Sequence, residues 1–169
     1  MSKASVRSRK SRAGFSHLSR GGQARMVSVA GKRITARQAR AEAWVRVGAA
    51  IAGRLRKSGG LAKGNVLETA RLAGILAAKQ TATMIPLCHP LPLDVVEVEA
   101  RLVGGRVRIE SRVACEGKTG VEMEAMTAVA IAALTVYDMC KSAGKGIRIG
   151  PIRLLEKSGG KSGPWRAEN

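Results

Sequence analysis

One segment constrains the fold of this chain more than any other: Gly117 to Lys141, GKTGVEMEAMTAVAIAALTVYDMCK. Its small, apolar centre predicts a helix buried in a core, yet Glu122 and Glu124 stand near its start and Asp138 and Lys141 at its end. At about 100° per residue, Glu124 and Asp138 return to within about 40° of one face. Because buried charges are costly unless they are paired or used, these ends are the first candidates for a functional site. The plainer interpretation is an ordinary core helix with a surface charge at each end.

The chain before this helix divides by periodicity and capping patterns. Residues 26–30, MVSVA, have the pattern of a short strand. Thr35, followed by Gln38, predicts a capped helix that runs through Leu55 and stops at Gly59-Gly60. Asn65, followed by Glu68, predicts the cap of a second helix that ends near Thr81.

The remaining segments predict strands and a turn-rich loop. The prolines in residues 84–90 exclude regular helix there. From Val96 apolar and charged residues alternate on both sides of Gly104-Gly105, which predicts a β-hairpin, and Ile147 to Leu155 alternates again as a last strand. The order predicts an α+β class: a ferredoxin-like βαββαβ fold with an added helix, an antiparallel sheet and helices on one face.

Length and charge predict one domain with tails. We expect a basic, disordered tail over 1–25, a single catalytic domain over 26–163 and a C-terminal tail over 164–169. The net charge is +18, and residues 1–40 hold no acidic residue. Such a tail is typical of a solvated extension, of a segment that binds nucleic acid or a membrane surface, or of a transit peptide.

The cysteine pattern favours a reducing compartment, and we expect a cytoplasmic protein. Cys88, Cys115 and Cys140 are odd in number and widely spaced, and the chain has no CxxC pair, so neither a disulfide framework nor a structural zinc site is predicted. Charged or polar residues interrupt every apolar run before the roughly 18 residues that a membrane span needs.

Several residues outside the helix are candidates for chemistry. Gly117-Lys118-Thr119 fails as a phosphate-binding loop because Arg112 occupies the required glycine position, and Gly144, Gly146 and Gly150 have the wrong spacing for a dinucleotide fingerprint. His89, in an irregular proline-rich segment, is either structural or part of a cleft. Lys63, before a helix, and Lys157 and Lys161, in a glycine-rich loop, are either solvated lysines or phosphate ligands.

Four segments together resemble a known family, molybdenum cofactor biosynthesis protein C, the cyclic pyranopterin monophosphate synthases. They are LAKGNVLETARLAGILAAK, MIPLCHPLPL, GKTGVEMEAMTAVAIAALTVYDMCK and LLEKSGGKSG, and MVSVAGK with the residues after it resembles that family's N-terminal part. The resemblance covers about residues 26–163. It implies a ferredoxin-like homohexamer, a trimer of dimers with active sites at subunit interfaces, which converts a cyclised dihydroguanosine triphosphate to cyclic pyranopterin monophosphate and pyrophosphate.

By matched position, the resemblance implies roles for individual residues. Asp138 is the expected catalytic aspartate, with Lys141 beside it and Lys63 as an essential loop lysine; Leu87, Cys88 and His89 form one substrate-contacting segment, and Met123 and Glu124 a second. We also expect Glu122, Lys157 and Lys161 to bind substrate, through guanine N–H groups and phosphates respectively. No cofactor or resident metal is implied.

Three positions depart from the family pattern. Ser28 replaces the usual Asp, Asn65 replaces an Asp without losing its capping role, and Gln80 replaces an Arg. A competing hypothesis is a basic RNA-binding module, but the predicted hairpin lacks the aromatic residues on which such sheets stack bases.

Overall fold

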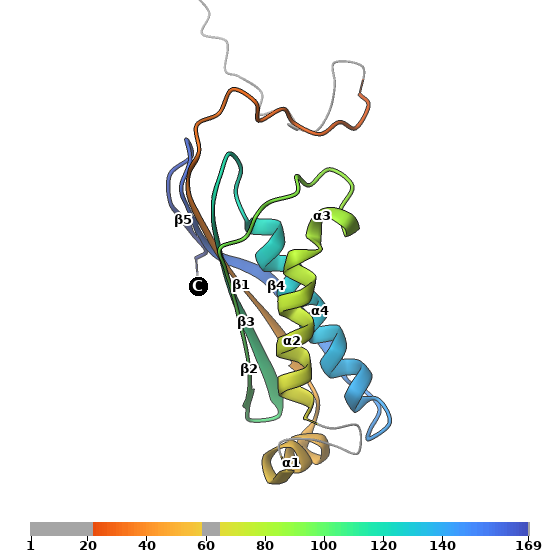
Figure 1. Ribbon diagram of the computed structural model, residues 1–169. Helices are drawn as coiled ribbons and strands as arrows, with labels where there is room; N and C mark the ends of the chain where they lie inside the picture. Colours follow the sequence, from red (N-terminus) through yellow and green to blue (C-terminus); the bar gives the residue numbers. More distant parts are fainter. Residues whose placement is uncertain (1–21, 59–64, 169) are drawn as a thin grey trace, which may run out of the picture.

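The computed structural model describes residues 22–58 and 65–168, which form one sheet with helices on one face (Figure 1). The strands are β1 (Thr35–Arg46), β2 (Val95–Val103), β3 (Arg106–Gly117), β4 (Arg148–Ser158) and β5 (Trp165–Arg166). The helices are α1 (Ala49–Ser58), α2 (Val66–Lys79), α3 (Thr81–Met84) and α4 (Glu122–Cys140).

The strand order confirms the predicted architecture. The strands lie in the order β2-β3-β1-β4-β5, and every neighbouring pair is antiparallel. With α2 between β1 and β2, and α4 between β3 and β4, the first four strands have the ferredoxin-like βαββαβ connection. The class is α+β, as expected.

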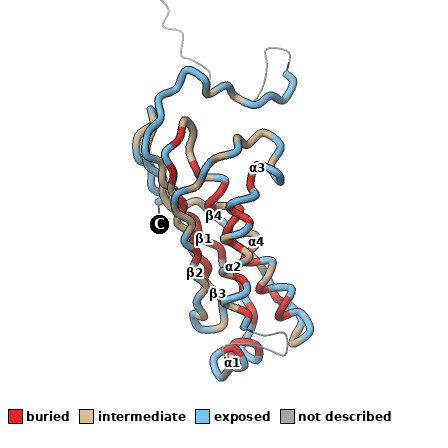
Figure 2. Tube along the Cα trace, in the orientation of Figure 1, coloured by how far each residue is buried: buried red, intermediate tan, exposed pale blue. Residues whose placement is uncertain are grey.

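The core lies between the sheet and the two long helices. α4 packs on β1, β3 and β4, and α2 packs beside it, largely over β2. The two helices approach closely at Gly74, where a Cβ atom would come within 2.9 Å of the Ala128 carbonyl oxygen. Ser111 of β3 donates a 2.8 Å hydrogen bond to the Ala125 carbonyl oxygen and fixes the first turns of α4 on the sheet. Figure 2 shows buried positions along the strands and along both helices.

The opposite face of the sheet is covered by arginine and glutamate side chains. At its centre Glu42 is only 3% exposed and accepts hydrogen bonds from Arg153 at 2.8 Å and Arg108 at 3.0 Å. Burial by itself would raise the pKa of Glu42, but these two guanidinium groups outweigh it and hold the pKa below its usual value. This face is therefore a network of paired charges.

The prediction for the N-terminal elements is wrong. Residues 26–30 form no strand, and Thr35 begins β1 rather than a helix; only Ala49–Ser58 of the expected helix is helical. The decisive pattern is period two: Ala39, Ala41, Ala43 and Val45 are fully buried under α4, while Arg40 and Trp44 lie on the other face. Alanine is a strong helix former, so local preference pointed to helix, whereas pairing with β3 and β4 on both sides fixed a central strand.

The other predicted elements are confirmed. The Asn65 side chain caps α2 by accepting a bond from the Glu68 amide at 3.1 Å, and the hairpin turns at Gly104-Gly105. The two-residue strand β5 was not predicted; it pairs with β4 through Glu156 and Lys157.

The helix α4 is more apolar than we expected when the sequence predicted no membrane span. By length and composition it could cross a membrane, but 56% of its most apolar window is buried inside the fold. Core helices of soluble proteins commonly have this character.

Candidate active site

A pocket of about 370 Å³ lies at the N-terminal end of α4. Its walls come from the segment after α3, the β3–α4 turn, the start of α4 and residues 27–32. Leu87, Cys88 and His89 line it together with Glu122, Met123 and Glu124. The structure thus brings together both expected substrate-contacting segments; we call this cavity the Glu124 pocket.

Glu124 is the unusual group in this pocket. It is 4% exposed, and its Oε2 atom has no hydrogen-bond partner among the described residues. Burial raises the pKa of the Glu124 carboxyl, and the Glu122 carboxylate raises it further. Burial, followed by the charge of Glu124, also raises the pKa of the Cys88 thiol. A buried polar atom without a partner is costly, so this carboxyl is suited to receive hydrogen bonds from a ligand or to exchange a proton with it.

A second pocket, of about 720 Å³, adjoins the first and shares Lys32, Thr119, Gly120 and Glu122 with it. Among the described residues that line it, Glu122 is the one carboxylate, whereas six side chains are basic: Lys32, Arg33, Arg37, Lys118, Lys157 and Lys161. We call it the basic pocket. Its charge suits an anion with several negatively charged oxygens.

An ion pair joins the two pockets. Lys157 Nζ lies 2.8 Å from Glu122 Oε1, so the end of β4 is bonded to the start of α4. Gly120 lies directly against the Glu122 carboxylate, which would have to shift if a Cβ atom were added at this position. Both Lys157 and Glu122 are only partly exposed.

The expected catalytic pair lies at the other end of α4. Lys141 Nζ and Asp138 Oδ1 are 2.6 Å apart, and both side chains are more than half exposed. In the single chain the hydrogen bond and the charge of Asp138 raise the pKa of Lys141 above its usual value. No pocket described above contains either residue.

One expected site residue is not described by the structure, and four residues that line the basic pocket were not predicted. Lys63 lies outside the described residues. Sequence reasoning missed Lys32, Arg33, Arg37 and Lys118 as lining residues of the basic pocket. Lys118 lies more than 80 positions after Lys32 and Arg33, and no sequence motif joins the three. Only the fold shows that they lie together.

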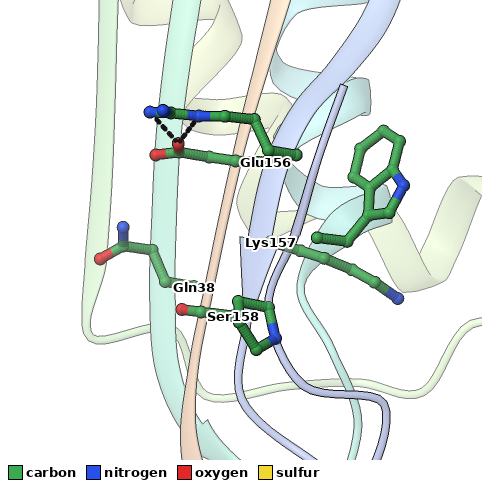
Figure 3. A pocket seen from close by; sticks show the side chains of 7 residues that line it. Gln38, Glu156, Lys157 and Ser158 are labelled. Atoms are coloured by element: carbon green, nitrogen blue, oxygen red, sulfur yellow. Dashed lines mark hydrogen bonds and ion pairs between the residues drawn. The ribbon is translucent and has the colours of Figure 1, made fainter. Parts of the chain in front are cut away.

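A groove of about 480 Å³ beside β4 and β5 shares Lys157 and Ser158 with the basic pocket (Figure 3). Gln38 and Glu156 line it, and Glu156 is bonded to Arg40 and Arg166. Figure 3 shows Lys157 pointing away from Glu156, as neighbouring residues of a strand must. The Lys157 ammonium group therefore serves the basic pocket on the helix side.

The fold and the paired pockets define a class: a ferredoxin-like α+β protein with two adjoining pockets, one of them basic, at one end of its core helix. The family model described as the MoaC family matches residues 26–160. The chain belongs to this family, an enzyme family of molybdenum cofactor biosynthesis, and its role lies in that pathway. The family implies a substrate derived from a nucleotide, and its members are soluble biosynthetic enzymes.

Proposed function

We propose that this protein is a cyclic pyranopterin monophosphate synthase, a phosphorus–oxygen lyase. It converts the cyclised dihydroguanosine triphosphate to cyclic pyranopterin monophosphate and releases pyrophosphate. The observation that supports this most is the pair of adjoining pockets: one holds a buried, unpartnered carboxyl and the other six basic side chains. A purine-derived group joined to a triphosphate has the same division between N–H donors and negative charge.

The residues of the two pockets suit this chemistry. Glu122 and Glu124 accept hydrogen bonds from N–H groups of the guanine-derived portion, and His89, in the same pocket, is the proposed proton carrier. Lys157 and Lys161 bind the phosphates. When a substrate hydroxyl attacks phosphorus to form the cyclic phosphate, the bond to pyrophosphate breaks, and nearby cations stabilise the charge on the departing group.

Asp138, Lys141 and Lys63 are proposed as the catalytic acid–base groups. Glu124 and Asp138 are 14 residues apart on one helix, which separates their backbones by about 21 Å at 1.5 Å per residue. One small substrate does not reach both. We therefore propose that each site takes its Glu124 pocket from one chain and its Asp138–Lys141 pair from another.

The outer surface of the helical layer favours such an assembly. Met123, Leu134 and Tyr137 on α4 are exposed, as are Leu72 and Leu76 on the neighbouring α2. An exposed apolar stripe that links the two ends of α4 is typical of a contact between copies of a chain. We propose that the chain assembles as a homohexamer, a trimer of dimers, in the cytoplasm.

The deciding experiment is a turnover assay with the cyclised dihydroguanosine triphosphate, in which pyrophosphate release and the cyclic product are measured. We expect stoichiometric formation of both. Deleting residues 1–21, which hold six Lys or Arg residues and no acidic residue, is expected to change kcat/KM by less than about twofold, because the match to the family model begins at residue 26. Absence of turnover in a folded, assembled protein contradicts the proposed function; loss of turnover on deletion alone points instead to a role of the basic segment.

A further inference from the structure

Three arginines on the face of the sheet away from the helices stand outside its network of ion pairs. Six other arginines of this face pair with its glutamates: Arg40, Arg101, Arg108, Arg112, Arg153 and Arg166. Arg46, Arg106 and Arg148 are exposed, and in the described part of the chain no carboxylate forms an ion pair with any of them. We call these three residues the arginine row.

The arginine row crosses three neighbouring strands at the end of the sheet where the β2–β3 hairpin turns. Arg46 of β1 lies directly opposite Arg106 of β3 on one side and Arg148 of β4 on the other. Val45 and Val47, which flank Arg46, are buried in the core, as are the residues next to Arg106 and Arg148 in their strands. Because successive side chains of a strand alternate between its faces, the three arginines share the outer face.

Like charges in directly opposite positions of a sheet repel and destabilise it. In the middle of this face glutamates remove that repulsion: Arg108 lies 3.0 Å from Glu42 and 3.1 Å from Glu110. The row has no such neighbour, and helix α1, at the same end of the sheet, adds Arg56 and Lys57 in its last turn and no acidic residue (Figure 1). The network therefore lacks its carboxylates at this end.

The surroundings of the row favour another protein as the source of these carboxylates. Val103 of β2, opposite Arg106, is 50% exposed and gives the row an apolar end. Arginine beside an exposed apolar side chain is typical of protein interfaces. A single-stranded nucleic acid would stack its bases on an aromatic ring, but the ring of Trp44, beside the row, is already covered by the Arg108 guanidinium, 5.6 Å from its centroid.

A second copy of this chain is a poor source of carboxylates. Of its twelve acidic residues, eight are already in ion pairs: Glu42, Glu68, Glu97, Glu99, Glu110, Glu122, Asp138 and Glu156. Glu124 is buried, which leaves Asp94, Glu116 and Glu168. Two copies that each have a net charge of +18 also repel one another.

We propose that the arginine row is a docking surface for an acidic segment of another protein, whose carboxylates complete the ion-pair network of the sheet. The exposed Val103 adds an apolar contact at the edge of this surface. The row lies at one end of β1 and Thr35, which lines the basic pocket, at the other, roughly 36 Å away at about 3.3 Å per residue. A docked partner therefore leaves the two pockets open.

The probe that tests this is a fluorescent peptide with glutamate at every second position, so that its carboxylates lie along one side of an extended chain. Its binding to the full-length protein is measured by fluorescence anisotropy. The row variant, Arg46→Gln/Arg106→Gln/Arg148→Gln, is expected to bind the peptide about tenfold more weakly, which corresponds to the loss of three exposed ion pairs of ordinary strength.

A matched control separates this surface from overall positive charge. The control variant, Arg101→Gln/Arg112→Gln/Arg166→Gln, removes the same number of charges from the same face, but from arginines that already have glutamate partners. It is expected to bind the peptide within about threefold of the wild type, since salt screens charges that do not touch the ligand. The row variant should unfold at the same temperature as the wild type or at a higher one, because facing like charges are removed.

Four results overturn the proposal. Equal losses in the row and control variants show attraction by net charge alone. Tighter binding of polyuridylate than of the peptide, lost in the row variant, shows a surface for nucleic acid. A smaller assembly of the row variant in light scattering shows an interface between copies of the chain, and a lower unfolding temperature shows that the arginines have partners within the fold.

Turnover separates this inference from the proposed function. The row variant is expected to keep the turnover of the wild type when no partner protein is present, because the row lines neither the Glu124 pocket nor the basic pocket. Peptide binding does not depend on the reaction. A failed turnover assay of the wild type therefore leaves the comparison of the two variants intact.

Discussion

The two ends of α4 carry similar side chains in opposite surroundings. At the N-terminal end Glu124 is 4% exposed beside a pocket, and Glu122 is bonded to Lys157 of β4. At the C-terminal end Asp138 and Lys141 form a close ion pair that is more than half exposed. The Glu124 pocket and the basic pocket lie at the first end and contain neither Asp138 nor Lys141. This difference supports the proposal that a single chain carries two halves of different sites.

The test with the largest expected effect removes the carboxylate of the exposed Asp138–Lys141 pair. Asp138→Ala is expected to lower kcat/KM by at least about 100-fold, the usual contribution of a general acid or base, because the substrate loses its proton partner. The far-UV circular dichroism spectrum should not change, since this side chain is more than half exposed. Lys145→Ala, an exposed lysine just beyond α4, is the matched control and should retain turnover. Normal turnover in Asp138→Ala would refute its assignment.

The next test asks whether the two halves meet across chains. Glu124→Gln and Asp138→Ala, each inactive alone, are mixed in equal amounts and allowed to exchange subunits. If a site draws one residue from each chain, random exchange restores about a quarter of the wild-type sites. Mass spectrometry of differently tagged subunits verifies the exchange. A mixture that exchanges fully and stays inactive shows that both residues act within one chain.

The smallest expected effect concerns stability at the buried end. The pKa of Glu124 is higher in the folded than in the unfolded protein, so between those two values the folded state binds more protons, and the free energy of unfolding falls as pH rises. Glu124→Gln removes this dependence. Its free energy of unfolding should exceed that of the wild type at neutral pH by about 1.4 kcal/mol per unit of pKa elevation. This difference should vanish below about pH 4, where the side chain at position 124 is uncharged in both proteins.

Chemical denaturation from pH 4 to 8 measures this difference. Glu122→Gln is the matched control, because it changes a carboxyl of the same helical turn but breaks the ion pair with Lys157; it should not be more stable at neutral pH. A flat difference between Glu124→Gln and the wild type across this range would show that Glu124 does not titrate abnormally.

Much of the fold was predictable because its strongest patterns are local. The α2 cap at Asn65, the hairpin around Gly104-Gly105 and the apolar helix α4 all follow from short-range rules of capping, turns and periodicity. β1 was missed for the opposite reason. Its alternating alanines favour helix locally, and only pairing with β3 and β4, distant in sequence, makes it the central strand.

The candidate site was also predicted in part from the sequence. The segments around His89 and Glu124 were expected to contact one ligand, and both line the Glu124 pocket. Arg37 was not expected as a lining residue of the basic pocket, because the sequence predicted a helix there. It lies in β1 instead, and the pairing of β1 with β4 brings it beside Gly160.

By itself the sequence determined that a helix of small apolar residues with charged ends would form the core, since the spacing and type of its residues decide helix formation and burial. Only the tertiary structure decided how those charged ends differ. Residues 87–91 and the β3–α4 turn line the pocket beside Glu124, which is 4% exposed, while Asp138 and Lys141 are more than half exposed. Burial depends on which distant segments cover a residue, and local sequence does not specify that.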